Sequence, residues 1–233
     1  MTHPSTILII PCYNEENNVG KLLREIQELN PGYDTLVIDD GSQDNTYAVA
    51  SQLSPCVKLL TNLGIGGAVQ TGIKYALQHN YELCVQVDGD GQHPPSQVYR
   101  LIESYLKSPA NLIISSRFLR KKGFKSTWKR RLGIKIISQV IQLLFQHKIT
   151  DPTSGLRMMD RKAIQLFSTE YPHDFPEPIS LAVALERGLR VREVAVNMRS
   201  REQGFSSITG IKSFLYMIRV IGYLILVRMG RHL

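Results

Sequence analysis

Two carboxylates separated by one glycine stand near the middle of the chain, in the run DGDGQ over residues 88–92. They follow the apolar run 83–87, which predicts a buried strand. At this spacing both carboxylates can face one pocket if the backbone turns at the intervening glycine. Hard ions such as Mg²⁺ and Mn²⁺ prefer oxygen ligands and usually share them with substrate phosphates. The run therefore predicts a metal and diphosphate site formed by Asp88, Asp90 and Gln92, with a solvated surface turn as the alternative.

A second acidic pair follows an earlier strand-like run, residues 35–38. Asp39 and Asp40 come directly after it. Two adjacent carboxylates at a strand end suit hydrogen bonding to a nucleobase or a ribose. Ser42 or Asp44 could cap the helix that follows, so capping explains part of this motif.

A glycine-rich loop, NLGIGGA over residues 62–68, opens a predicted helix at 67–79. Dinucleotide-binding loops also use glycines, which let backbone N–H groups approach a pyrophosphate. Here the glycine spacing differs, and the loop follows the third strand rather than the first. We therefore exclude a dehydrogenase and expect a loop that packs closely against a donor molecule.

The strands and helices predicted around these motifs alternate along the chain. Strands are predicted at 6–10, where Pro11 ends the run, and at 35–38, 57–60, 83–87, 112–114 and 191–196, and helices at 19–29, 67–79, 95–107 and 134–145. Uniformly apolar strands in such an alternation predict a mostly parallel α/β sheet covered on both faces. Ligands of these sheets bind at the carboxyl ends of the strands, where the polar motifs lie.

The composition fits one soluble α/β domain with an anionic partner. The chain has 233 residues, 43% apolar residues and a formal net charge of +8. The three cysteines show no metal-ligand spacing, and their odd number favours a reducing compartment. No signal-peptide pattern follows Met1, so a cytoplasmic protein is expected.

Residues 117–135 contain nine basic residues, with Phe118, Phe124 and Trp128 interleaved among them. This segment suits an anionic membrane leaflet, where each Lys or Arg contributes about 1 kcal/mol. No nucleic-acid-binding motif accompanies it, so nucleic acid is not expected as a partner. A solvated basic face remains the alternative.

Six motifs in order carry a resemblance to a known family. The chain resembles family 2 glycosyltransferases, and within them the dolichyl-phosphate mannose synthase branch of polyprenyl-phosphate glycosyltransferases, from residue 6 to about 207. The motifs are PCYNE at 11–15, DDGS at 39–42, the glycine-rich loop, DGDGQ at 88–92, DPTSGLR at 151–157 and REQGFSS at 201–207.

The resemblance implies a GT-A fold over residues 1–207, with 208–233 as a C-terminal amphipathic helix. It implies an inverting transfer from a nucleotide-diphosphate sugar to a polyprenyl phosphate such as undecaprenyl or dolichyl phosphate, with Mg²⁺ or Mn²⁺. The implied donor residues are Pro11, Tyr13, Glu15, Asp39, Asp40, Gly67 and Asp88, and the metal residues are Asp88, Asp90 and Gln92. The implied phosphate and acceptor residues are Arg117, Arg131 (or its neighbour Arg130), Arg201 and Ser206.

Asp151 and Glu177 are the candidates for a catalytic base, with Asp151 preferred, while Asp90 is expected to act on the leaving diphosphate. Asp151 also reads as a turn acid before Pro152, and Glu177 as an acid at a helix start. A lipid phosphate is already ionised at neutral pH, so transfer to it can proceed by positioning and electrostatic stabilisation alone. Transfer to a glycan or another hydroxyl acceptor would require the base.

The segment 211–227 contains the last apolar run, 214–227, which is interrupted by Arg219 and Gly222 and is short for a membrane span. It is expected to be an interfacial helix, a contact between copies, a docking surface for a small membrane protein, or a packed core helix. Together with the basic segment it predicts peripheral association with the inner face of the cell membrane. The donor is left open among UDP-glucose, UDP-N-acetylglucosamine and GDP-mannose, and a non-catalytic nucleotide-sugar or nucleic-acid binding module is the alternative from another class.

Overall fold

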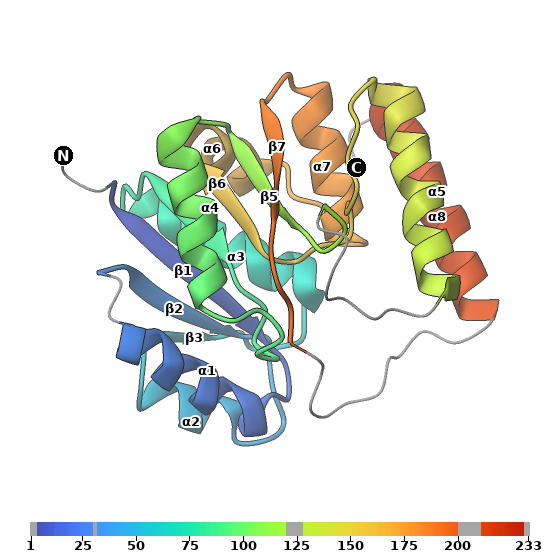
Figure 1. Ribbon diagram of the computed structural model, residues 1–233. Coiled ribbons are helices and arrows are strands. Elements are labelled where there is room, and N and C mark those ends of the chain that lie inside the picture. Colours follow the sequence, from blue (N-terminus) through green and yellow to red (C-terminus); the bar gives the residue numbers. More distant parts are fainter. Residues whose placement is uncertain (1–3, 30–31, 120–127, 200–210, 231–233) are drawn as a thin grey trace.

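The computed structural model describes residues 4–29, 32–119, 128–199 and 211–230, apart from the side chains of residue 129 and residues 211–214. Among these residues, seven strands form one sheet (Figure 1). The strands are β1 (Thr6–Cys12), β2 (Asp34–Asp39), β3 (Cys56–Lys58), β4 (Leu83–Gln86), β5 (Leu112–Ser116), β6 (Arg157–Asp160) and β7 (Val191–Ala195). Their order is β3-β2-β1-β4-β6-β5-β7, and β6 alone runs antiparallel to its neighbours.

The described helices are α1 (Glu16–Leu29), α2 (Thr46–Ser51), α3 (Gly64–Gln78), α4 (Ser96–Lys107), α5 (Trp128–Phe145), α6 (Arg161–Thr169), α7 (Pro176–Glu186) and α8 (Ile211–Arg228). They cover both faces of the sheet because successive strand residues point to opposite sides. Leu8 and Ile10 of β1 belong to a core with α1 and α4. Ile7 and Ile9 belong to a second core with α3 and α6. The predicted mostly parallel, two-sided α/β architecture is confirmed.

The structure corrects several predicted boundaries. Pro11 does not end β1, which continues to Cys12, because proline removes only one ladder donor and its neighbours still pair with β2. The third helix begins at Gly64 rather than at residue 67, and α5 begins at Trp128 rather than at residue 134. Strand β6 was not predicted, because its four residues begin and end with a charged side chain.

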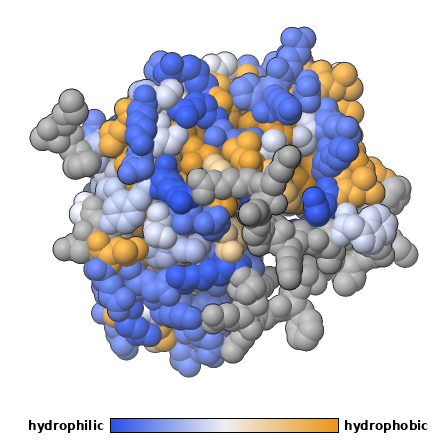
Figure 2. Space-filling view, in the orientation of Figure 1, coloured by the Kyte–Doolittle hydropathy of each residue, from blue (hydrophilic) through white to orange (hydrophobic). Residues whose placement is uncertain are grey.

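Helices α5 and α8 pack side by side at one end of the sheet (Figure 1). One face of α8 enters the same core as the sheet through Val220, Leu224 and Val227. Other side chains of the pair are exposed, and hydrophobic surface is visible on this side of the molecule (Figure 2). These exposed residues are Trp128, Leu132 and Leu143 of α5 and Leu215, Ile218 and Ile225 of α8. In the described part of the chain no helix combines the length and apolarity that crossing a membrane requires.

Candidate active site

The loops that follow β1 and β2 are joined by hydrogen bonds at the carboxyl edge of the sheet. The backbone N–H of Asn14 donates to Ser42 Oγ at 2.9 Å, and that of Glu15 donates to Thr46 Oγ1 at 2.7 Å. Asp44 Oδ1 accepts the N–H of Thr46, the first residue of α2, at 2.9 Å. Asp44 therefore supports the start of this helix, whereas Ser42 serves the neighbouring loop.

The two acids after β2 have different surroundings. Asp39 is fully buried, and its Oδ1 accepts the Ser42 N–H at 3.1 Å. Its Oδ2 has no hydrogen-bond partner among the described residues. Asp40 Oδ1 accepts the Leu63 N–H at 2.8 Å and thereby ties the glycine-rich loop to the strand end. Burial raises the pKa of Asp40, an effect that the N–H groups of Leu63 and Gly64 oppose.

Close packing explains two glycines at the start of α3. A Cβ on Gly66 would lie 2.5 Å from the carbonyl oxygen of His173 and 2.7 Å from its Cα. A Cβ on Gly67 would lie 2.5 Å from Leu63 Cβ. The backbone after α6 therefore reaches the loop at Gly66, and no larger residue fits there without movement.

The loop after β4 carries the predicted metal residues. Asp90 Oδ1 accepts the Gln92 N–H at 3.0 Å, and the Asp88 side chain is 33% exposed. His93 Nε2 lies 3.8 Å from Asp88 Oδ2, while its Nδ1 has no hydrogen-bond partner in the described part of the chain. Burial lowers the pKa of His93 to about 4, so this imidazole is neutral at pH 7.

This loop fits a hard divalent ion that takes part of its coordination from substrate. Among the described residues, no three His, Cys, Asp or Glu side chains are grouped as a metal centre. Asp88, Asp90 and Gln92 instead offer two carboxylates and one amide, all oxygen donors on one loop. Mg²⁺ usually takes only one or two protein carboxylates and completes its shell with phosphate oxygens and water.

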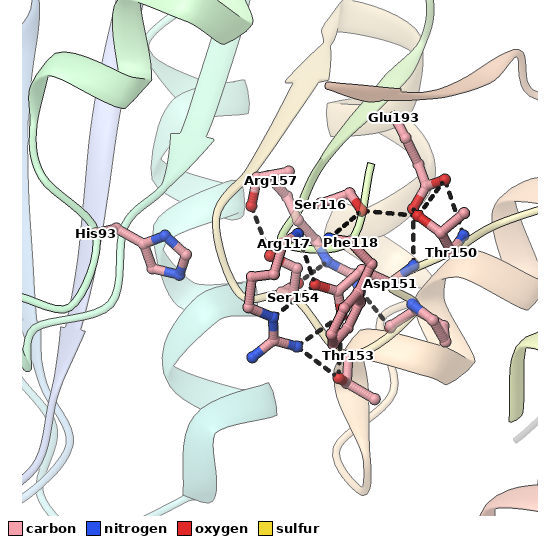
Figure 3. Close-up of polar contacts among 12 residues, drawn as sticks. His93, Ser116, Arg117, Phe118, Thr150, Asp151, Thr153, Ser154, Arg157 and Glu193 are labelled. Carbon is pink, nitrogen blue, oxygen red and sulfur yellow. Dashed lines mark hydrogen bonds and ion pairs between the residues drawn. The ribbon is translucent and has the colours of Figure 1, made fainter. Parts of the chain in front are cut away.

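A buried ion pair lies on the other side of the site (Figure 3). The Asp151 carboxylate is fully buried and accepts the Nε and NH2 groups of Arg117, each at 2.6 Å. The backbone N–H of Arg117 donates to the same carboxylate at 3.1 Å, and its NH2 group also donates to Thr153 Oγ1 at 2.9 Å. The guanidinium of Arg117 is thus fixed in one orientation by a bidentate partner.

Glu193 of β7 accepts hydrogen bonds from the segment that carries Asp151 (Figure 3). Its Oε1 accepts the Asp151 N–H and its Oε2 the Thr150 N–H, both at 2.8 Å. Burial raises the pKa of Glu193, and these N–H groups oppose the rise. Sequence reasoning missed Glu193, because it lies outside every motif, in a strand whose alternation gives no hint of a partner.

The other predicted site residues are distributed unevenly. Pro11 lies inside β1, and Tyr13 is 44% exposed in the loop that also holds Glu15. Glu177 lies in the first turn of α7, partly buried, and its pKa is raised by burial, with Arg157 lowering it and Asp88 raising it further. Arg130 and Arg131 are exposed on α5. Arg201 and Ser206 lie outside the described residues.

Acidic loops and a fixed arginine thus lie at the carboxyl edge of the sheet, where ligands of such α/β sheets bind. The chain belongs to glycosyl transferase family 2, because the model of the family described as "Glycosyl transferase family 2" matches residues 7–167. It is a glycosyltransferase, and the family predicted from the six motifs is confirmed.

Named relatives and solved structures are similar to nearly the whole chain. The chain is 28% identical to "UDP-N-acetylglucosamine--dolichyl-phosphate N-acetylglucosaminyltransferase" of Methanococcus voltae, over 96% of each chain. It is 32% identical to "Undecaprenyl-phosphate mannosyltransferase" of Micrococcus luteus, over 88% of this chain and 87% of the relative. Glucosyl-3-phosphoglycerate synthase of Mycobacterium tuberculosis, solved with Mn²⁺, uridine diphosphate and phosphoglyceric acid, has a similar fold, with a TM-score of 0.73 and 18% identity over 98% of this chain and 79% of that one.

Proposed function

We propose that this glycosyltransferase moves one sugar from a nucleotide-diphosphate sugar to a polyprenyl phosphate, with inversion at the anomeric carbon. One observation carries the proposal: a loop with two carboxylates and an arginine fixed by a buried carboxylate lie at the same edge of the sheet. The proximity of the two halves is supported by Gly155, in the turn that begins at Asp151, because a Cβ there would lie 2.5 Å from Asp88 Oδ1. The two relatives named above, which are dolichyl-phosphate and undecaprenyl-phosphate transferases by name, support the acceptor class.

The donor half is assigned to the loops after β1, β2 and β4. Asp39 Oδ2, buried and without a described partner, suits an N–H donor on a nucleobase. Asp88, Asp90 and Gln92 would hold Mg²⁺ or Mn²⁺. A metal bound there would neutralise the negative charge that develops on the departing diphosphate.

The acceptor half is assigned to arginines, with Arg117 joined by Arg131, Arg201 and Ser206. An oxygen of the lipid phosphate attacks the anomeric carbon while the bond from that carbon to the diphosphate breaks. Because the attacking oxygen is already ionised, the protein's work is to orient the phosphate and stabilise charge. The bidentate pair with Arg117 therefore favours Asp151 as the residue that holds this arginine, in preference to a role as base.

Glu177 is the candidate base if the acceptor is a hydroxyl instead. Burial raises its pKa toward the range in which a carboxylate can take a proton at neutral pH. The two acceptor classes predict different results for Glu177→Gln. Transfer to a phosphate would keep most of its rate, whereas transfer to a hydroxyl would fall by about 10²-fold or more.

The exposed apolar residues of α5 and α8, together with Arg130, Arg131 and Arg219, support peripheral binding to an anionic membrane. The protein should co-sediment with phosphatidylglycerol vesicles at low salt and release at high salt. Ile218→Ser should weaken this binding, while Leu106→Ser on α4, equally exposed, should not. Equal binding to neutral phosphatidylcholine vesicles would contradict the electrostatic part of the proposal.

The assignment of acceptor and donor is tested by a screen of the purified chain. UDP-glucose, UDP-N-acetylglucosamine and GDP-mannose are each incubated with undecaprenyl or dolichyl phosphate and Mg²⁺ or Mn²⁺, and lipid-linked sugar is measured by mass spectrometry. The matching unphosphorylated polyprenols serve as the control acceptor. Product on the phosphate alone, with the anomeric configuration inverted in its NMR coupling, is expected; product on the alcohol would move the assignment to the hydroxyl-acceptor class.

A further inference from the structure

Arg157, at the start of β6, is a buried cation that the proposed reaction does not use. It is 2% exposed and forms no ion pair with any described residue. Its guanidinium donates instead to three neutral oxygens, from Nε to Ser154 O at 2.7 Å, from NH2 to Pro152 O at 2.9 Å and from NH1 to Ser180 Oγ at 3.0 Å. Transferring a charged guanidinium from water to the protein interior costs free energy, so the burial of Arg157 must bring a compensating benefit.

Two of these three bonds fix the turn over residues 151–155. Pro152 and Ser154 are the turn's own residues, and their carbonyl groups converge on the one guanidinium (Figure 3 labels Ser154 and Arg157). The planar fork of arginine can donate in several fixed directions at once, which a lysine cannot do. Arg157 therefore holds the turn in one position through the carbonyl groups of Pro152 and Ser154.

The end of this turn touches the metal loop directly. A Cβ on Gly155 would lie 2.5 Å from Asp88 Oδ1 and 2.7 Å from Asp88 Cγ, and still nearer to Oδ2. The Asp88 carboxylate thus lies against the backbone of Gly155, with no room for even a methyl group. Any displacement of the turn changes the space that Asp88 has.

The charges around Arg157 match this arrangement. Glu177, Asp151 and Asp88 come from three different segments, and each favours the charged form of the buried guanidinium, against the larger effect of burial, which lowers the pKa of Arg157.

We propose that Arg157 and Gly155 are positioning residues for the Asp88 side of the metal and diphosphate site. Arg157 holds the 151–155 turn in place, and Gly155 gives the Asp88 carboxylate the room to lie there. This inference rests on the proposed function, in which Asp88 is a metal ligand. Outer partners that orient a metal ligand typically change metal affinity by about 10- to 100-fold when they are lost.

The test is Mn²⁺ binding by the full chain, measured as loss of the free Mn²⁺ signal in electron paramagnetic resonance, with UDP or GDP present. Arg157→Lys keeps the charge but not the fork, Arg157→Met removes both, and Gly155→Ala inserts a methyl group against Asp88. Arg161→Lys is the matched arginine control, since Arg161 also donates to backbone carbonyls, those of Leu77 and Tyr81. Gly222→Ala is the glycine control, because nothing lies within 4 Å of its Cβ position.

The expected result is a rise of about 10-fold or more in the Mn²⁺ dissociation constant for Arg157→Lys, Arg157→Met and Gly155→Ala. Both control variants should bind like the wild type, and urea unfolding of Gly155→Ala should remain cooperative. Wild-type affinity in Arg157→Lys or in Gly155→Ala would overturn the inference alone. No Mn²⁺ binding by the wild type with either nucleotide would overturn the metal part of the proposed function as well.

Discussion

Neutralising Asp151 should destabilise the protein through its effect on Arg117. The carboxylate accepts three bonds from this one arginine, and both side chains are almost fully buried. Asp151→Asn removes the charge and turns one oxygen into a donor that faces a guanidinium N–H. Removing one partner of a buried pair costs about 3–5 kcal/mol, because the other charge is left buried without compensation. Since domains of this size lose about 2–4 °C of melting temperature per kcal/mol, the melting temperature should fall by roughly 6–20 °C.

The assay is urea unfolding of the wild type, Asp151→Asn, Arg117→Met and the double variant. Each single variant should lose about 3–5 kcal/mol, and the double variant should lose clearly less than the sum, because it no longer contains an unpaired buried charge. The matched control is Glu170→Gln. Glu170 also accepts Nε and NH2 of one arginine, Arg187, with the same 2.6 Å contact, but both side chains are exposed. Its loss should cost less than about 1 kcal/mol.

The expected coupling between Asp151 and Arg117 would be wrong if the single losses were additive in that cycle, or if Asp151→Asn were as stable as Glu170→Gln. Either result would mean that the Arg117 guanidinium gains little from its carboxylate. Arg117 would then be free to adopt another orientation, and the case for a fixed phosphate-binding arginine would lose its basis.

Three further predictions concern other parts of the molecule. Gly66→Ala should lower the free energy of unfolding by about 1–3 kcal/mol in urea denaturation, because backbone atoms occupy the space that the methyl group would need. Gly222→Ala should not destabilise the protein, and equal stability of the two variants would contradict the close packing at Gly66. Burial raises the pKa of Cys56 to about 11 and also raises that of Cys12. Iodoacetamide at pH 8 should therefore modify neither thiol in the native protein and both in urea, which intact-mass measurement would show. Rapid labelling of Cys12 in the native protein would contradict this expectation. Burial raises the pKa of Glu193 above its ordinary 4.5, so between pH 4.5 and the folded pKa the unfolded chain releases this proton while the folded protein keeps it. Relative to Glu193→Gln, the wild type should therefore lose stability as pH rises through this range. A stability difference between the two that is independent of pH would contradict the raised pKa.

The sheet could be predicted because its strands are apolar on both faces. Runs such as Ile7–Ile10 and Leu83–Val87 have few other stable arrangements in a chain that alternates with helices. The acidic loops could be located for the same reason, since they directly follow these strands. Strand β6 escaped prediction because Arg157 and Asp160 read as exposed, although Arg157 is buried among neutral oxygens.

The supporting contacts of the site could not be predicted, because they join segments that no spacing connects. Arg117 and Asp151 were both predicted site residues, but their pairing depends on how β5 and the 151–155 turn meet. Glu193 reaches Asp151 from a strand at the far edge of the sheet, and it does so through a backbone N–H that every residue carries. A hydrogen bond to a backbone N–H does not depend on the type of residue that carries it, so such a contact cannot be predicted from a single sequence.

The loop from Asp88 to Gln92 should drive sugar transfer to a lipid phosphate only with a metal ion bound, and a single time course measures this dependence. Lipid-linked sugar is followed with the best donor, polyprenyl phosphate and Mn²⁺, for the wild type and Asp90→Ala, with EDTA added midway. Product formation by the wild type should be steady, stop on EDTA addition and resume with excess Mn²⁺, and Asp90→Ala should form little product. Full activity of Asp90→Ala, or a wild-type rate unaffected by EDTA, would mean that this loop does not act through a bound metal ion.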